Sequence, residues 1–176
     1  MKTATTVSGE QLANTLHTLG VRFLLGGQPA AKPLPPVRLL IALAESEEAR
    51  LRLALIPLFL ARPEMAAHAQ KAAARLSLPA RHTLQCYYTA AVDLQRLHRP
   101  RITALLGEPR PLPDLFSGEL SLPAPEIGAP LAHLQALAQR HQFLTDTAVN
   151  WLGTYQHAAQ TWLKGLALNQ HTHAPL

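Results

Sequence analysis

Basic side chains are the residues of this chain whose type and spacing come closest to a chemical site. The strongest cluster is Arg96-Leu-His-Arg-Pro-Arg101, and further cations stand before and after it. If these segments meet in space, they form one positive surface that can hold phosphates or the acidic face of a protein. The predicted binding residues for nucleic acid or an acidic partner are Lys71, Arg75, Arg81, Arg96, His98, Arg99, Arg101 and Arg110. The competing interpretation is a solvated helix end, where cations favour the negative pole of the helix dipole.

Patterns that would indicate catalysis or a bound metal are missing from the sequence. It contains no HExxH pair, no serine nucleophile elbow and no Walker lysine loop. No two of the nine histidines stand three or four positions apart, the spacing that brings two ligands to one helix face. We therefore expect no catalytic residue, no metal site and no cofactor. The single cysteine, Cys86, is expected to be a buried, inert thiol.

One spacing leaves an enzymatic alternative open. Arg62 and His68 are separated by five residues, and Arg75 and His82 by six. This spacing resembles that of HEPN-type helical ribonucleases, and the resemblance implies that such a pair acts at the RNA backbone. A proline interrupts each pair, which disturbs the continuous helix on which the motif depends.

Aromatic residues follow a helical stripe near the C-terminus. Trp151, Tyr155 and Trp162 fall on one face at helical spacing, whereas Tyr87 and Tyr88 point to different sides of an earlier helix. The stripe is typical of a core. Because Trp, Tyr and Arg are also concentrated in interfaces, the same five aromatic residues are the candidates for a partner interface. With 48% hydrophobic and only 15% charged residues, some apolar surface is expected to be covered by a homodimer or another chain.

The elements that must position these residues are predicted to be helices. Leu and Ala dominate and no long alternating pattern occurs, which favours an all-α fold, a compact bundle of five to seven helices. Residues 36–45 and 47–62 resemble one HEAT-type α-hairpin. Its second helix, apolar throughout 53–61, is expected to be the central helix, with a kink at Pro57.

A proline-rich stretch divides the predicted helices. Residues 107–130 carry six prolines and three glycines, but recurring Leu and Phe residues predict an ordered strap across the helical body. The predicted organisation is a single helical domain over 1–168 and a flexible C-terminal tail over 169–176. Whether 21–27 form a short strand stays open.

These features favour a non-enzymatic helical interaction protein, a subunit or adaptor of a protein or nucleoprotein assembly. A net charge of +5 permits binding of nucleic acid or an acidic protein without requiring it. The alternatives are a nucleic-acid-binding module and, with less support, the HEPN-like ribonuclease. We expect a protein partner or a homo-oligomer, and no membrane contact, since the longest apolar run is about half of the ~20 residues that a span needs. Without an apolar signal core at the N-terminus, a cytoplasmic location is the simplest expectation.

Overall fold

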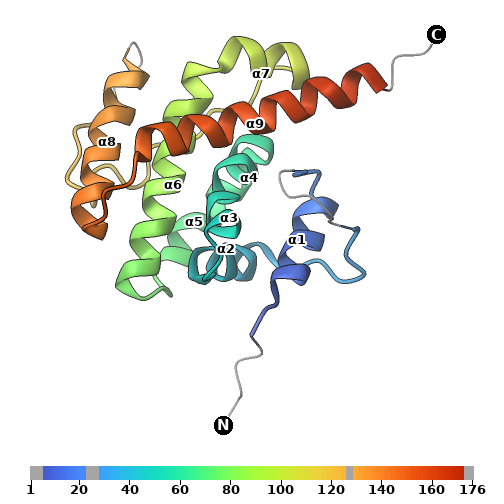
Figure 1. Ribbon diagram of the computed structural model, residues 1–176, viewed down its shortest axis with the longest axis horizontal. Coiled ribbons are helices and arrows are strands. Elements are labelled where there is room, and N and C mark those ends of the chain that lie inside the picture. The colour runs from blue at the N-terminus through green and yellow to red at the C-terminus, as the bar shows by residue number, and fades with distance from the viewer. Residues whose placement is uncertain (1–5, 23–27, 126–128, 173–176) are drawn as a thin grey trace.

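The computed structural model describes residues 6–22, 28–125 and 129–172, and within these ranges it is all-helical, without strands. Its helices are α1 (Gly9–Thr18), α2 (Pro36–Glu45), α3 (Ala49–Leu53), α4 (Leu55–Ala61), the 3-10 turn η1 (Pro63–Met65), α5 (Ala66–Ala73), α6 (Leu78–Leu97), α7 (Arg99–Leu106), α8 (Pro130–Thr145) and α9 (Trp151–Thr172) (Figure 1). The predicted all-α class is confirmed. The described residues contain more helical segments than the five to seven expected, because prolines in the first turns of α4 and α7 separate these helices from the ones before them.

The centre of the molecule is α6. It packs against α2, α4, α5, α8 and α9, and α9 lies across it (Figure 1). All its residues from Leu84 to Gln95 are buried, so this stretch of the helix has neighbours on every side. The sequence prediction placed the central helix at 47–62 instead. The apolar run there is a good signal of burial, whereas α6 carries polar residues that sequence alone does not mark as buried.

The predicted helix over 47–62 is interrupted, and the interruption precedes Pro57. It divides at Ala54 into α3 and α4, and Pro57 lies in the first turn of α4. Pro57 has no N–H to donate to the carbonyl of Leu53, and its ring crowds that same carbonyl. The proline therefore disturbs the helical turn that precedes it. The residues from Ala54 to Leu60 are buried, as the apolar run predicts.

The first helix is held at both ends. The side chain of Ser8 accepts a hydrogen bond from the backbone N–H of Gln11 at 3.1 Å, which satisfies one free donor at the start of α1. Gly20 follows the helix with φ +78°, a conformation that favours glycine. Of the possible strand over 21–27, Val21 and Arg22 adopt no strand and the remaining residues lie outside those described.

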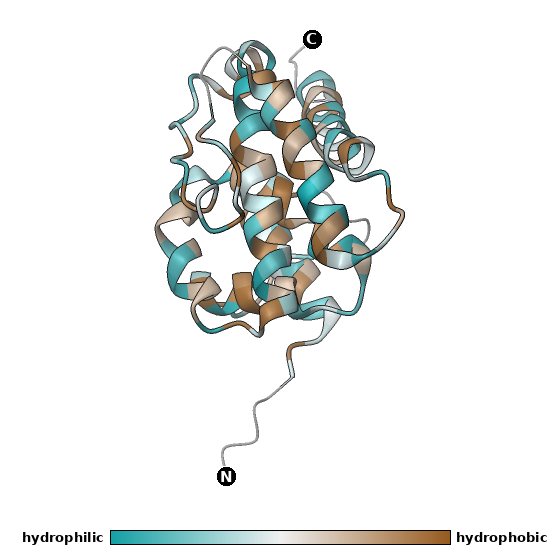
Figure 2. Ribbon diagram, turned by 90° about the vertical axis from the view of Figure 1, so that its left-hand side faces the viewer, coloured by the Kyte–Doolittle hydropathy of each residue, from teal (hydrophilic) through white to brown (hydrophobic). Residues whose placement is uncertain are grey.

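The buried hydrophobic residues of α1 to α9 form one core cluster. Figure 2 shows the same packing from the side, with hydrophobic and hydrophilic residues alternating along the helices as in amphipathic segments. The last helix continues to Thr172, four residues into the stretch predicted as a flexible tail. Among the described helices, none combines the length and the apolar character needed to cross a lipid bilayer.

Candidate functional site

The predicted basic residues do not form one surface, because α6 separates them. Arg81 lies in the first turns of this helix and Arg96 in the last. Fifteen residues at ~1.5 Å each place them about 22 Å apart along the helix axis. The structure therefore divides the predicted site into two groups, one at each end of α6.

The first group, the α6–α7 end, consists of Arg96, His98, Arg99, Arg101 and Arg110. Arg99 forms an ion pair with Glu108, so part of its charge is neutralised. Burial, followed by the charge of Arg101, lowers the pKa of His98 below its usual value, which keeps this ring neutral at pH 7. Arg101 and Arg110 are exposed, and neither forms an ion pair within the described part of the chain.

The second group, the α5–α6–α8 corner, is Lys71, Arg75, Leu78, Arg81, His82, Arg140 and Phe143. The guanidinium of Arg81 donates to the carbonyls of Ala73 and Leu76, at 3.0 and 3.2 Å, and so binds the free C-terminal end of α5. Burial and then the charges of Arg140 and Arg81 lower the pKa of His82. These three basic side chains therefore lie close together.

Arg140 joins this corner from α8 and was absent from the sequence prediction. No spacing in the sequence links position 140 to positions 75 and 81, since only the packing of α8 on α6 brings them together. The side chain of Arg140 lies over the ring of Phe143, 5.1 Å from its centre. Phe143 is nevertheless 74% exposed, and Leu78 is 61% exposed. The corner thus combines cations with two large apolar side chains in solvent.

The two predicted Arg–His pairs are not arranged as one helical motif. Arg62 ends α4 and forms an ion pair with Glu64 at 2.7 Å, whereas His68 belongs to α5. Arg75 follows α5 and His82 lies within α6. Each arginine and its histidine therefore stand on different elements.

Most of the candidate interface aromatics belong to the core of the chain itself. Tyr87, Tyr88, Tyr155 and Trp162 are buried, and Trp151 is partly exposed. A partner can therefore reach at most Trp151 without rearrangement of the helices, and this corrects the set of candidate interface residues.

Trp151 itself stacks on the ring of His141, with ring centres 3.6 Å apart. Tyr155 donates its hydroxyl to Nδ1 of His141 at 2.5 Å, and burial raises the pKa of this tyrosine, so the proton stays on its oxygen. His141 thus contacts two aromatic residues of α9, whose rings are also close to each other.

The chain matches no known protein-family model. Searches of curated protein sequences and of solved structures also give no significant match. Any functional assignment therefore depends on the geometry of the chain itself.

A buried Asp–His–Ser arrangement lies between α6, α8 and the segment that joins α7 to α8. Asp93 Oδ2 is 2.6 Å from Nδ1 of His133, and Nε2 of His133 is 3.4 Å from Oγ of Ser117. The order of atoms is that of a catalytic triad. However, Nε2 is closer to the carbonyl oxygen of Pro123, at 2.9 Å, and the Ser117 hydroxyl donates to Asp114 at 2.7 Å. Nε2 therefore carries a proton and cannot accept one from Ser117.

The exposure of these residues agrees with a structural role. Asp93, His133 and Ser117 are 0%, 5% and 2% exposed, so a substrate has no access to the serine. Burial raises the pKa of Asp93 to about 6, although the hydrogen bond and charge of His133 oppose the shift. Both ring nitrogens face acceptors, so the pair is held either as carboxylate and imidazolium or as carboxylic acid and imidazole. The arrangement connects α6 and α8 to the segment that joins α7 to α8.

The polar side chains of α6 bind the backbone of the same connecting segment. Gln95 donates to the carbonyl of Arg110 at 2.9 Å and accepts from the N–H of Leu112 at 2.8 Å. The hydroxyl of Tyr88 donates to the carbonyl of Pro113 at 2.7 Å. Buried backbone groups need such partners. The polar face of α6 therefore serves this segment rather than an active site.

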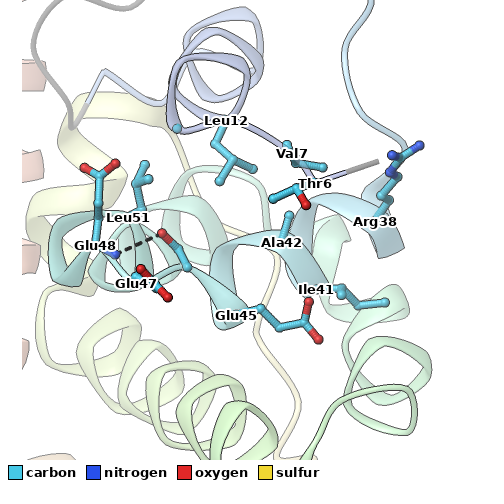
Figure 3. A pocket seen from close by; sticks show the side chains of 12 residues that line it. Thr6, Val7, Leu12, Arg38, Ile41, Ala42, Glu45, Glu47, Glu48 and Leu51 are labelled. Atoms are coloured by element: carbon cyan, nitrogen blue, oxygen red, sulfur yellow. Dashed lines mark hydrogen bonds between the residues drawn. The ribbon is translucent and has the colours of Figure 1, made fainter. Parts of the chain in front are cut away.

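No three side chains able to bind a metal come together in the described residues. Burial raises the pKa of the Cys86 thiol to about 12, so no reactive thiolate forms near neutral pH. A groove of about 730 Å³, the α1–α2 groove, lies between the start of α1, the outer face of α2 and the turn into α3 (Figure 3). It contains none of the residues predicted from the sequence.

Proposed function

We propose that the chain is a non-enzymatic interaction protein, a subunit or adaptor that binds the acidic and partly apolar surface of a protein partner at the α5–α6–α8 corner. The observation that carries this proposal is that two large apolar side chains are largely exposed, Phe143 against the guanidinium of Arg140 and Leu78 three residues after Arg75 in the chain. Exposed apolar side chains of this size gain free energy when a partner covers them, and the surrounding cations select an acidic partner.

Two further features support an interaction protein over an enzyme. The Asp93–His133–Ser117 arrangement is sealed and its histidine nitrogens are occupied by hydrogen bonds. At the corner, Arg75 and Arg140 form no ion pair with a described acid, so neither charge is neutralised, although Nε of Arg140 donates to the carbonyl oxygen of Leu120 at 2.9 Å. We further propose that the chain acts as a homo-oligomer or within a complex in the cytoplasm. Its scaffold would be a HEAT-like α-hairpin over 36–62 together with the proline-rich strap over 107–130.

A defined probe tests the proposal. A fluorescein-labelled acidic amphipathic peptide, Glu-Leu-Leu-Glu-Glu-Leu-Leu-Glu, is titrated with the protein and followed by fluorescence polarisation. The double variant Arg75→Glu with Phe143→Ser should weaken binding at least tenfold, because it reverses one exposed charge and removes the exposed ring. Arg101→Glu, which changes the same charge at the opposite end of α6, should change the affinity less than twofold. Absence of binding, or equal weakening by both variants, would exclude the corner as the site.

Nucleic-acid binding is the second candidate function, and the α6–α7 end favours it. Arg101 and Arg110 are exposed there without an acidic partner in the described residues. A labelled oligouridylate of ~20 nucleotides should then bind with an affinity that falls steeply between 50 and 200 mM salt. Arg101→Glu with Arg110→Glu should abolish this binding and leave the acidic peptide unaffected. A flat salt response would remove the nucleic-acid candidate.

A further inference from the structure

The α1–α2 groove has apolar walls contributed by three elements. Leu12 of α1 and Leu51 of α3 are buried at its base, and Val7, Ile41 and Ala42 line its sides (Figure 3). Its volume of about 730 Å³ lies within the range of ligand-binding clefts, roughly 300–1,000 Å³. The groove can therefore take up several apolar side chains of a ligand.

Close contact between α1 and the turn into α3 shapes one end of the groove. A methyl group at Gly9 would lie 2.8 Å from a carboxylate oxygen of Glu48 and 3.3 Å from a methyl group of Leu51. The absence of a side chain at Gly9 thus lets the first turn of α1 approach α3. The carboxylate of Glu48 also lies near the positive end of the α1 dipole.

The rim of the groove is acidic. Glu45, Glu47 and Glu48 all line it. Glu48 is engaged by Arg50 at 2.8 Å, but Glu45 and Glu47 are exposed and form no ion pair with any described residue. Arg38 lies at the opposite end from Glu48 in Figure 3. Two available carboxylates, those of Glu45 and Glu47, therefore lie next to the apolar walls of the groove.

We propose that the α1–α2 groove binds a basic amphipathic helix of a partner protein. The apolar face of this helix lies against the half-buried side chains of Val7, Ile41 and Ala42, and its Lys or Arg side chains meet Glu45 and Glu47. Docking of an amphipathic helix into a groove between helices is a recurrent mode of peptide recognition. The inference goes beyond the function proposed above, because it concerns a separate surface of opposite charge.

The positive net charge of the chain opposes nonspecific electrostatic binding of a cationic peptide. At +5 the protein as a whole repels a cationic peptide. Electrostatic attraction to the molecule as a whole therefore does not favour binding, and an affinity that rises at low salt indicates a local negative field such as that of Glu45 and Glu47.

The probe is a fluorescein-labelled peptide, Lys-Leu-Leu-Lys-Lys-Leu-Leu-Lys, titrated with the full chain at 50 and 200 mM salt. Wild-type protein should bind it, more tightly at the lower salt concentration. The double variant Glu45→Lys with Glu47→Lys should raise the dissociation constant at least tenfold. Glu10→Lys, which changes the same charge on an exposed residue outside the groove, should change it less than twofold.

A second variant tests the apolar walls independently of charge. Ala42→Trp places a large ring in the groove and should also weaken binding at least tenfold, with circular dichroism used to check the helical content. The inference is overturned if wild-type protein does not bind the basic peptide, or if both groove variants bind it as wild type does. Variants of Arg75 and Phe143 should leave this binding unchanged, so failure here is separable from failure of the corner to bind the acidic peptide.

Discussion

At the scale of single residues, the molecule holds two buried titratable groups with opposite effects on stability. Burial raises the pKa of Asp93 to about 6 and lowers that of His141 to about 4. Asp93 is therefore more readily protonated in the folded chain than in the unfolded chain, and His141 less readily. Because each pKa shift links protonation to folding, Asp93 raises the free energy of unfolding as the pH falls, whereas His141 lowers it.

Asp93→Asn should remove the contribution of Asp93 to the pH dependence of stability. The folded protein takes up a proton at Asp93 between about pH 6 and pH 4, where an unfolded aspartate is still ionised, so this group adds stability as the pH falls. Two pKa units correspond to about 3 kcal/mol. Urea unfolding at pH 7 and pH 4 should show wild type gaining up to about 3 kcal/mol over the variant at the lower pH. Parallel pH profiles would contradict a raised pKa at Asp93.

His141→Gln should have the reverse effect. An unfolded histidine gains a proton near pH 6.5, while the folded His141 resists it until about pH 4, so wild-type stability falls across this window. The loss amounts to about 3 kcal/mol. Glutamine keeps an oxygen to accept from the hydroxyl of Tyr155 but does not titrate. The variant should lose this acid sensitivity in the same unfolding measurements, and a decline as steep as that of wild type would exclude His141 as its source.

At the scale of elements, the segment from 107 to 125 consists of turns and irregular backbone. Side chains of α6 hold this segment through hydrogen bonds to its backbone. Gln95 is the clearest example, since one amide group bonds to both the carbonyl of Arg110 and the N–H of Leu112. A glutamine in the middle of a helical sequence usually indicates an exposed position. Its burial here follows from its partners in the backbone.

Gln95→Leu should release this part of the segment. The change removes two hydrogen bonds and leaves a buried N–H and a buried carbonyl without partners, at a cost of about 2–4 kcal/mol. Hydrogen exchange at the amide of Leu112 should accelerate more than the global loss of stability explains. Gln135→Leu, at an exposed position of α8, is the matched control and should change neither quantity by more than a small amount.

The sequence predicts some elements well, and the reasons differ from element to element. Capping is a local interaction, and the residues that cap α1, Ser8 and Gly20, stand directly beside it in the sequence. Pro57 predicts a disturbance, but the break occurs at Ala54, since a proline acts on the preceding turn. The condition on which the basic residues would form one surface, that their segments meet in space, depends on how the helices pack. Local patterns do not reveal that α6 separates Arg81 from Arg96, nor that α8 delivers Arg140 and His133 to their partners.

At the scale of the whole molecule, one core cluster extends over helices from α1 to α9 and includes Cys86. The thiol lies in the buried stretch of α6 and its pKa is raised to about 12. Reagents reach it only when the packing around α6 opens. The residue therefore reports on opening of the whole core.

Cys86 should react with a thiol reagent such as DTNB far more slowly than a free cysteine, by at least a thousandfold at pH 7. The rate should rise in parallel with unfolding as urea is added, because exposure of the thiol needs the helices around α6 to separate. Gln95→Leu should accelerate the reaction only to the extent that it lowers global stability. Rapid labelling of the native protein would show that α6 opens locally without unfolding.

The length of α6 also fixes a distance in the molecule. Its twenty residues span about 30 Å, and side chains at its two ends carry the two separate basic groups. Because the middle of the helix is packed on all sides, the distance between its two ends is fixed. Two anionic ligands bound simultaneously would be held at a constant spacing, and a single extended ligand would have to match that spacing to touch both.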